Sequence, residues 1–547
     1  MTSPACRTHL VAAAAAAGSA LAFALYARVA WPWLVLGWVG LVPWLAALDR
    51  TRSLGGALVS GLCMCIAFTL AVFGWFPSAI EDYTGAPRAV ALLAVVFMAP
   101  LLEPQFVAVA LGRTLARRAA AGPWRTALAG AGIYVGTEWA TPKLFADTLG
   151  HGLYASTWMR QAADVAGAHG LTFLLLLGND GLLAATRAAM AGGPASIRIR
   201  RACTPAAAVA ALVLALVLYG AWRSAQLAAG GRHADDVTVG MVQADISHYD
   251  RLRAEVGTFD AVRTIIDAHF ALSAEALRRA DLDFLVWPET VYPTTFGAPK
   301  SEDGAAFDRE IGAFVARAGV PLVFGAYDAD GRDEFNAAVF LAPAAHGPLA
   351  FATYRKTWLF PLTERLPPAL DSERVRRWLP WLGTWKPGAG PKVIPLSLRD
   401  GRALRIAPLI CYDAAVPSFA LAAIRGGADL IVTLSNDSWF TYGDVPRLIL
   451  IVSAFRSIET RRPQVRATNT GISAVIAPTG EMLATAGVDE RAVVVATVTP
   501  EPRAMTLMLA WGDWFGPTAL VSGVLLLAAP LATRRRPDSS TGNSGCV

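Results

Sequence analysis

The chain has 547 residues, of which 54% are hydrophobic and only 16% are charged, and its mean hydropathy is +0.43. A soluble protein of this size needs more charge to cover its surface, so the composition favours a membrane protein over several soluble domains. The formal net charge of +6 does not indicate a nucleic-acid partner, because the arginines cluster beside apolar runs instead of forming a basic face interleaved with aromatic residues.

Eight apolar segments are long enough, or nearly so, to cross a bilayer as helices of about 20 residues. They are His9–Ala27, Val29–Leu48, Leu54–Phe76, Ala89–Leu111, Arg125–Ala140, Ala163–Thr186, Thr204–Trp222 and Phe515–Ala532. The first is followed at once by a Trp-rich segment, which favours an uncleaved anchor over a signal peptide. The sequence therefore predicts an eight-helix transmembrane bundle, with seven spans in residues 1–232 and the eighth in residues 514–547.

Arginine placement predicts the orientation of these spans. Clusters follow the second, fourth, sixth and eighth segments: Arg50 and Arg52; Arg113, Arg117, Arg118 and Arg125; Arg187, Arg198, Arg200 and Arg201; Arg534, Arg535 and Arg536. All of them fall on one side if both termini are cytoplasmic, as the positive-inside rule expects. Residues 233–513, between the seventh and eighth spans, then face the periplasm or the cell exterior.

Residues 233–513 alternate strand-like and helix-like patterns. The strands are expected at Val237–Gln243, Phe284–Trp287, Pro321–Tyr327, Ala337–Leu341, Leu349–Thr353, Leu404–Cys411, Leu430–Leu434, Ser473–Ile476 and Ala492–Val498. The helices are expected at Arg251–Arg279, Ala305–Ala318, Pro417–Arg425 and Pro446–Thr460. Such interleaving predicts one layered α/β domain. Periodicity alone does not distinguish a Rossmann-like sheet from a two-sheet sandwich.

Three polar residues stand at strand ends in this domain: Glu289, Lys356 and Cys411. A carboxylate can take the proton of a thiol that attacks a carbonyl, and an ammonium can stabilise the thiolate and the oxyanion. Only five of the 48 basic residues are lysines. The chain elsewhere uses arginine for positive charge, so a lysine at position 356 indicates a specific role. Taken singly, Glu289 reads as a turn residue, Lys356 as a surface lysine and Cys411 as a buried core cysteine.

Taken together, the three segments resemble the Glu-Lys-Cys triad of the nitrilase superfamily. The sequence motifs around them are most similar to those of the apolipoprotein N-acyltransferases. These motifs are Trp287-Pro-Glu-Thr290, Tyr354-Arg-Lys-Thr-Trp-Leu-Phe-Pro-Leu-Thr-Glu364 and Ile410-Cys-Tyr-Asp413. The likeness continues through Ser435–Phe440, Arg456–Glu459, Arg461–Pro463, Arg466–Asn469, Gly471 and Gly512–Trp514. It covers nearly the whole chain, including the layout of eight spans with one domain before the last.

The resemblance implies a nitrilase-type αββα sandwich inserted between the seventh and eighth transmembrane helices. It makes Cys411 the nucleophile, Glu289 the general base and Lys356 the cation beside the oxyanion. The supporting or substrate-binding residues that it implies are Glu364, Asn336, Tyr412, Asp413 and Trp439. The implied reaction is ping-pong: Cys411 takes the sn-1 acyl chain of phosphatidylethanolamine as a thioester and releases lysophospholipid. The thioester then acylates the α-amine of the diacylglyceryl-cysteine of a prolipoprotein. The location implied is the bacterial inner membrane, with a periplasmic catalytic domain.

Several positions depart from the family pattern. Asp413 stands where Glu is common, Leu362-Thr363 replaces Phe-Gly, Thr441 replaces Gly, and Arg251-Leu252 replaces Lys-Trp; a histidine common after Trp-Phe is missing. These changes leave open a diverged acyltransferase with another acceptor. A membrane-anchored amidase or hydrolase with the same triad is a second hypothesis, and an inactive scaffold or transporter is a third.

Other motifs carry less weight. The sequence has no HExxH pair and no Cys/His cluster, so we expect neither a metal nor another cofactor. Gly130–Gly136 fits a dinucleotide-binding pattern but lies within an apolar span, where small residues for helix packing are the better interpretation. Glu138 and Asp180 lie in or beside spans, and we expect packing or interface roles for them and not a transport path.

Overall fold

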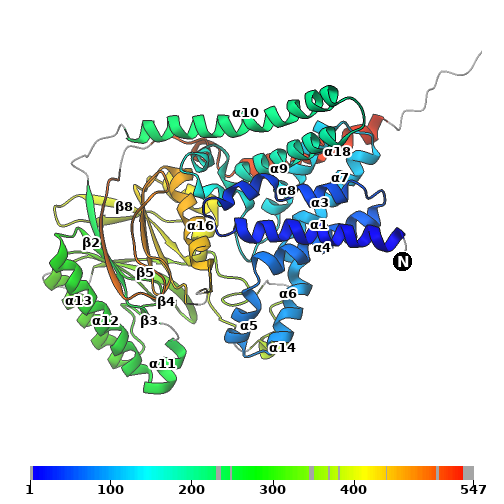
Figure 1. Ribbon diagram of the computed structural model, residues 1–547. Helices are drawn as coiled ribbons and strands as arrows, with labels where there is room; N and C mark the ends of the chain where they lie inside the picture. Colours follow the sequence, from blue (N-terminus) through cyan, green and yellow to red (C-terminus); the bar gives the residue numbers. More distant parts are fainter. Residues whose placement is uncertain are drawn as a thin grey trace, which may run out of the picture.

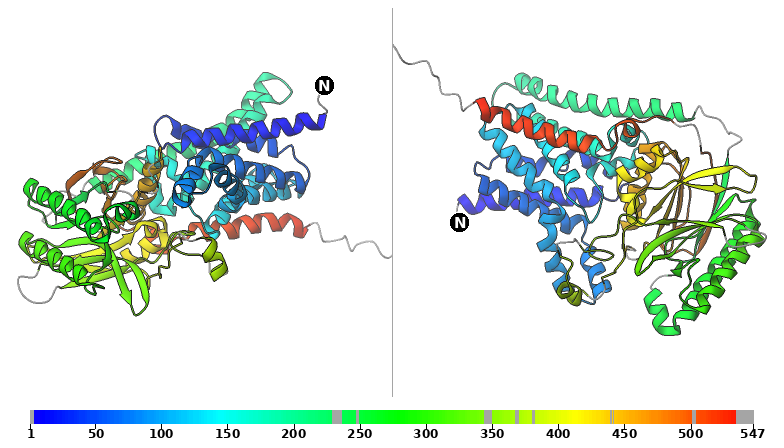
Figure 2. Two further views of the ribbon diagram at one scale, coloured as in Figure 1. Left: turned by 90° about the horizontal axis from the view of Figure 1, so that it is seen from below. Right: turned by 180° about the vertical axis from the view of Figure 1, so that it is seen from behind.

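The computed structural model describes residues 4–228, 236–246, 249–343, 350–366, 370–379, 382–438, 440, 442–500 and 504–533. A helical bundle lies beside a domain of two β-sheets, and the described N-terminus lies at the end of the bundle far from the sheets (Figures 1 and 2). The first bundle helices are α1 (Pro4–Tyr26), η1 (Trp33–Val35), α2 (Leu36–Val39), α3 (Val42–Leu48), α4 (Leu54–Val72), α5 (Phe76–Thr84), α6 (Arg88–Leu102) and α7 (Pro104–Arg118). They continue with α8 (Pro123–Ala140), η2 (Leu149–Ala155), η3 (Met159–Ala162), α9 (Ala163–Met190), α10 (Ala195–Ala228) and, after the sheets, α18 (Phe515–Thr533).

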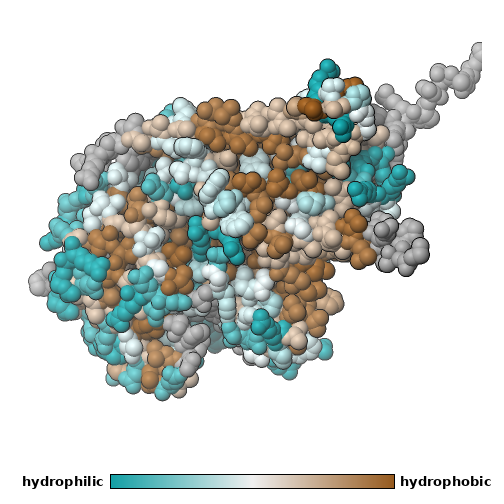
Figure 3. Space-filling view, viewed as in Figure 1, coloured by the Kyte–Doolittle hydropathy of each residue, from teal (hydrophilic) through white to brown (hydrophobic). Residues whose placement is uncertain are grey.

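The described bundle has three helices long and apolar enough to cross a membrane, α4, Met159–Met190 and α10. The pair α6 and α7 gives a fourth if it forms one bent span, and Leu10–Tyr26, Trp33–Leu48 and Phe515–Ala529 are shorter apolar helices. The eight-span layout therefore stays a prediction. Figure 3 shows apolar surface gathered on the bundle and hydrophilic surface on the sheet domain.

Two expected spans are not continuous helices. The segment Ala89–Leu111 is divided into α6 and α7, which meet at an angle of 48°. The break falls at Glu103, whose backbone leaves the helical region (φ −128°, ψ 48°) directly before Pro104. The proline ring clashes with the preceding residue in the helical conformation, so a helix tends to end there. The segment Val29–Leu48 is likewise divided into η1, α2 and α3.

Glycines in α8 allow close helix packing. A Cβ at Gly136 would lie 2.4 Å from the Cα of Leu520 in α18, and one at Gly132 would lie 2.7 Å from the carbonyl oxygen of Ala519. The backbones of α8 and α18 can approach this closely only without side chains there. The small-residue interpretation of Gly130–Gly136 is therefore confirmed.

The domain is built on two sheets. The first has the order β13-β1-β2-β4-β5-β6, with β3 paired to β4, and the second has the order β12-β11-β10-β9-β8-β7. The strands of the first are β1 (Val237–Gln243), β2 (Phe284–Val286), β3 (Tyr292–Thr295), β4 (Leu322–Asp330), β5 (Asp333–Leu341), β6 (Phe351–Arg355) and β13 (Ala492–Val498). Those of the second are β7 (Ile394–Ser397), β8 (Ala403–Ile410), β9 (Leu430–Ser435), β10 (Gln464–Thr468), β11 (Ala474–Ile476) and β12 (Met482–Thr485). At the centre of each sheet the strands run parallel, β1-β2-β4 and β8-β9-β10.

Helices cover the outer faces of both sheets (Figure 1). The helices of this part of the chain are α11 (Tyr249–Val256), α12 (Thr258–Arg279), α13 (Glu302–Ala318), α14 (Glu373–Trp378), η4 (Cys411–Ala415), α15 (Pro417–Arg425), α16 (Val445–Thr460) and α17 (Leu507–Trp511). Of these, α12 and α13 lie on the first sheet, whereas α14 lies beside α5 (Figures 1 and 2). One apolar core joins the two sheets, with Val239 and Val286 of the first beside Ile406 and Val432 of the second. The sequence left a single sheet and a sandwich open; the domain is a two-sheet sandwich.

The outermost layer next to the bundle is α16. Its side chains Leu450, Ile451 and Phe455 belong to the apolar core of the bundle. A buried ion pair strengthens this junction, because Arg461, directly after α16, donates to Asp164 of α9 over 2.8 Å. The domain is thus seated on the bundle through α16.

Candidate active site

Glu289, Lys356 and Asn336 form a buried cluster with the partly buried Glu364 at strand ends of the first sheet. Glu289 follows β2, Asn336 lies in β5, and Lys356 follows β6 directly. The Nζ of Lys356 lies 3.0 Å from Oε1 of Glu289 and 2.9 Å from Oε1 of Glu364. Asn336 donates through Nδ2 to Glu289 Oε1 over 2.7 Å, and its backbone carbonyl accepts from the backbone N–H of Lys356. The structure thus brings four of the predicted site residues together.

Cys411 is presented by a tight turn at the end of β8, as the first residue of η4. Its φ of 48° lies in the left-handed region, which costs a non-glycine residue about 1–3 kcal/mol. Thr290, directly after Glu289, has a similar φ of 59°. Strained backbone of this kind concentrates at functional sites, where the surrounding structure holds it in place.

The ionisation of the cluster is set by burial and by mutual charge. Burial raises the pKa of the Glu289 carboxyl above its ordinary value, and the Lys356 charge opposes this shift. Burial alone would lower the pKa of Lys356, but Glu289 and Glu364 outweigh it and hold that pKa well above its usual value. Burial also raises the pKa of the Cys411 thiol, with Lys356 opposing and the two carboxylates reinforcing the shift. Cys411 therefore rests as a neutral thiol within electrostatic reach of a carboxylate and an ammonium, and it needs a base to become a nucleophile.

Asp413 ties the turn that carries Cys411 to the segment that carries Lys356. Its Oδ1 accepts from the backbone N–H groups of Thr357 (3.2 Å) and Trp358 (2.7 Å). Its Oδ2 accepts from the Tyr354 hydroxyl (2.7 Å) and the backbone N–H of Ile410 (3.0 Å). Burial raises the pKa of Asp413 to about 6, against the hydrogen bonds that lower it. Both carboxylate oxygens of Asp413 accept hydrogen bonds from groups of the protein. Asp413 therefore supports the site and does not contact a substrate.

Tyr412 points toward the bundle. Its hydroxyl donates to the carbonyl oxygen of Lys143, in the loop after α8, and its ring packs edge-on against Phe360 at 5.3 Å between centroids. The residue after Cys411 is therefore anchored to the helical part of the chain. Trp439, the remaining predicted site residue, lies outside the described residues, as does Thr441.

Two family models match the chain. One, described as carbon-nitrogen hydrolase, matches residues 238–504, and the other, described as apolipoprotein N-acyltransferase N-terminal domain, matches residues 15–180. The apolipoprotein N-acyltransferase of Bdellovibrio bacteriovorus is 28% identical over 493 residues, covering 86% of this chain and 85% of that one. The namesake of Chlorobaculum tepidum is 26% identical, with 92% of each chain covered.

This chain belongs to the apolipoprotein N-acyltransferase family. With its apolar helices, this membership makes it a bacterial membrane protein. Among solved structures, an amidase from Nesterenkonia covers 49% of this chain and 93% of its own, with a TM-score of 0.36 and 18% identity. Nit3 of Saccharomyces cerevisiae covers 49% and 91%, with a TM-score of 0.37 and 18% identity.

Sequence reasoning missed three contributors to the site. The backbone N–H of Asn436, after β9, donates to Oε2 of Glu289 over 2.8 Å. Tyr354 holds Asp413, and a Cβ at Gly325 in β4 would lie 2.6 Å from the Cα of Glu289. Asn436 and Tyr354 lie within the family motifs quoted above. The motifs therefore marked these two residues but did not indicate what they do. Nothing in the sequence marks Gly325, because its role is to let β4 approach the backbone of the segment after β2.

Proposed function

We propose that this protein transfers a fatty acyl chain from a phospholipid, through a thioester on Cys411, to the α-amine of the diacylglyceryl-cysteine that begins an apolipoprotein. The observation that carries the proposal is the buried cluster of Glu289, Lys356 and Glu364 beside the strained turn of Cys411. Family membership supports the choice of substrates. Phosphatidylethanolamine is the proposed donor and a diacylglyceryl-prolipoprotein is the proposed acceptor.

The first half-reaction loads the enzyme. Glu289 takes the proton of the Cys411 thiol as Sγ attacks the sn-1 ester carbonyl, and the ammonium of Lys356 stabilises the oxyanion. The ester C–O bond then breaks, and the leaving alkoxide takes the proton from Glu289 to give a lysophospholipid. Asn336 and the N–H of Asn436 hold the Glu289 carboxylate in place, and Glu364 keeps Lys356 paired throughout.

The second half-reaction discharges the thioester. The amine nitrogen attacks the thioester carbonyl, Glu289 accepts the proton that the amine loses, and the C–S bond breaks. The departing thiolate recovers that proton, which leaves an amide on the acceptor and a free Cys411. Water excluded from the site favours the amine as acceptor over hydrolysis.

The topology follows the same proposal. Residues 1–232 form seven spans, residues 233–513 form the catalytic domain, and residues 514–547 hold the eighth span and a cytoplasmic tail. Both termini face the cytoplasm of the inner membrane and the catalytic domain faces the periplasm. A site at the membrane surface suits lipid substrates, because drawing an acyl chain out of hydrocarbon costs about 0.8 kcal/mol per CH₂.

A mass shift on Cys411 tests the proposal. Full-length protein mixed with phosphatidylethanolamine is expected to gain one acyl chain, and Cys411→Ala is expected to gain none. Cys203→Ala, which removes an exposed cysteine of α10, is the matched control and should load normally. Adding a diacylated lipopeptide should move the acyl group to its amine. A folded protein that never acquires the adduct contradicts the proposal, and release of free fatty acid alone replaces the transferase with a hydrolase.

A further inference from the structure

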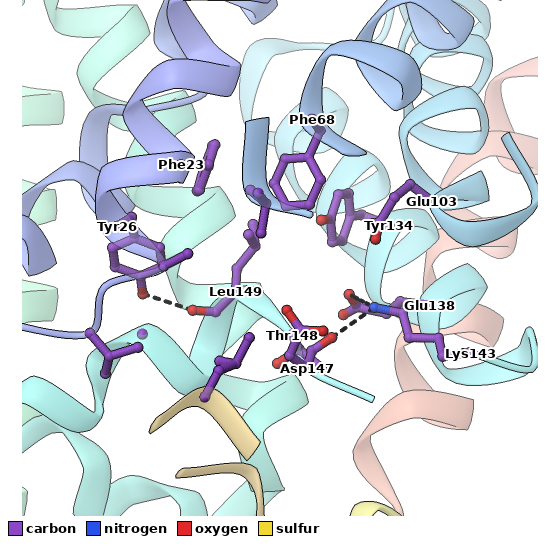
Figure 4. A pocket seen from close by; sticks show the side chains of 15 residues that line it. Phe23, Tyr26, Phe68, Glu103, Tyr134, Glu138, Lys143, Asp147, Thr148 and Leu149 are labelled. Atoms are coloured by element: carbon purple, nitrogen blue, oxygen red, sulfur yellow. Dashed lines mark hydrogen bonds and ion pairs between the residues drawn. The ribbon is translucent and has the colours of Figure 1, made fainter. Parts of the chain in front are cut away.

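A small cavity lies in the bundle at the end next to the sheet domain. It has a volume of about 30 Å³, and side chains of α1, α4, α8, η2 and α16 line it together with the loop after α8. Figure 4 shows Glu138, Lys143 and Asp147 on one side and the aromatic rings of Tyr26, Phe68 and Tyr134 around the rest. The proposed chemistry uses none of these side chains.

The cavity has more acidic than basic groups. Glu103, Glu138 and Asp147 line it, and Lys143 is the only basic residue among its described lining residues. Lys143 Nζ is committed to Glu138 Oε1 (2.8 Å) and to the carbonyl oxygen of Asp147 (2.8 Å). Buried carboxylates in excess of their cations are costly unless they are protonated or another cation joins them.

One carboxylate oxygen is left for a ligand. Glu138 is only 3% exposed, and its Oε2 has no hydrogen-bond partner within the part of the chain that the structure describes. A buried acceptor without a partner costs free energy that a bound N–H group recovers. The unpartnered oxygen belongs to a side chain that lines the cavity.

Size and surroundings favour an ammonium group. Aromatic rings beside carboxylates attract a cation through the negative faces of the rings as well as through charge. A volume of about 30 Å³ is enough for a group of about the size of water, which suits –NH₃⁺.

The cavity is connected to the nucleophile. The carbonyl oxygen of Lys143 accepts the hydroxyl of Tyr412, the residue that follows Cys411, so one tyrosine side chain separates the loop of Lys143 from the thiol turn. We infer that this cavity binds the primary ammonium group of a lipid substrate and so holds that lipid beside the turn of Cys411. The inference rests on the proposed function. Two substrates carry such a group: the ethanolamine headgroup of the donor and the free α-amine of the acceptor.

Equilibrium binding tests the inference without turnover. Full-length Cys411→Ala is mixed, in one arm, with phosphatidylethanolamine or with phosphatidylglycerol of the same acyl chains. In the other arm it is mixed with a diacylated lipopeptide or with the N-acetylated form of that lipopeptide. Native mass spectrometry measures the bound lipid. We expect the ammonium-bearing ligand to bind about tenfold more tightly in one arm, and Glu138→Gln in the same background to remove that preference.

The arm that responds identifies the source of the ammonium. Asp180→Asn, which alters a bundle carboxylate paired with Arg113 over 2.6 Å, is the matched control and should keep the preference. Asp147→Asn is the second variant if Glu138→Gln does not fold, and it should weaken the preference in the same arm. No preference in either arm, or a preference that survives these changes, overturns the inference.

Failure of the cavity and failure of the proposed function remain distinguishable. Wild-type protein that binds the ammonium ligand selectively but never forms a thioester keeps the cation site and loses the transferase. Wild-type protein that loads and transfers normally, with no effect of Glu138→Gln on binding or on either half-reaction, keeps the transferase and loses the cation site.

Discussion

Replacing Tyr354 by Phe tests whether Asp413 holds Lys356 in place against Cys411. The Tyr354 side chain is fully buried and its hydroxyl donates to Asp413 Oδ2 over 2.7 Å. The substitution removes this bond and adds no polar group, so Asp413 keeps its three backbone donors. A hydrogen bond to a charged group contributes about 1.5–3 kcal/mol. At about 2 °C per kcal/mol for a unit of this size, the unfolding midpoint should fall by roughly 3–6 °C.

The same substitution should slow acyl loading. A misplacement of about 1 Å at a catalytic group lowers the rate about a hundredfold. We expect a less firmly held Asp413 to displace Lys356 by less than this distance, and so to lower the loading rate about tenfold. Intact-protein mass spectrometry after rapid mixing with phosphatidylethanolamine measures the rate. Tyr292→Phe is the matched control, because Tyr292 is equally buried and donates to Asp308 Oδ1 over 2.7 Å.

The control bond joins β3 to α13 and not to the turn of Cys411. Tyr292→Phe should therefore lower the unfolding midpoint by a similar amount and leave loading at the wild-type rate. Equal loading rates in the two variants would refute the positioning role of Asp413. Unchanged midpoints in both would refute the energy assigned to the hydrogen bond.

Three further predictions concern Glu289. Glu289→Gln should slow loading by about 10²–10⁴-fold, the usual contribution of a general base, while the fold survives because Lys356 keeps its ion pair with Glu364; a normal rate by the same mass assay would remove Glu289 from the base role. Since burial raises the pKa of Glu289 above the ordinary value of 4.5, the reactive carboxylate is lost as the pH falls through that raised pKa. A pH–rate profile of loading should thus fall on its acid side at a pH above 4.5, and an acid limb at or below that pH would contradict the shift. Gly325→Ala should destabilise the domain by about 1–3 kcal/mol and slow loading, because its Cβ would press on the Glu289 backbone; thermal unfolding and loading measured together would expose an error if either stayed unchanged.

The gathering of these candidate residues was predictable because they stand in short sequence motifs at strand ends. Glu289 follows β2 and Lys356 follows β6 in the first sheet, and Cys411 follows β8 in the second, and functional side chains often stand where rigid strands end. The pairing of Lys356 with two carboxylates at once was not predictable. It depends on the path of the chain between β6 and Glu364, which returns that carboxylate to Nζ. No local pattern encodes such a return.

The elements that were predicted wrongly share a cause. In each, a single residue decided the structure against the hydropathy or polarity pattern of the residues around it. Hydropathy predicted one continuous helix over α6 and α7, although Glu103 before Pro104 breaks the helix there. Amphipathicity joined α11 and α12, although Gly257 stands between them with φ 87°. Strand β10 was missed because it contains Arg466, which is buried only because it pairs with Asp437 over 2.8 Å. Tertiary partners of this kind reverse what polarity alone suggests.

Consecutive residues after the nucleophile hold it to two different parts of the protein. Asp413 binds the Lys356 segment, and Tyr412 binds the bundle through the Lys143 carbonyl. A soluble amidase with this triad needs only the first tie, because its substrate arrives from water. An acyl chain that remains in hydrocarbon needs the thiol fixed relative to the membrane base as well, since each CH₂ drawn into water costs about 0.8 kcal/mol. The Tyr412 tie therefore serves an enzyme whose acyl donor stays in the membrane, whether the acceptor is an amine or water.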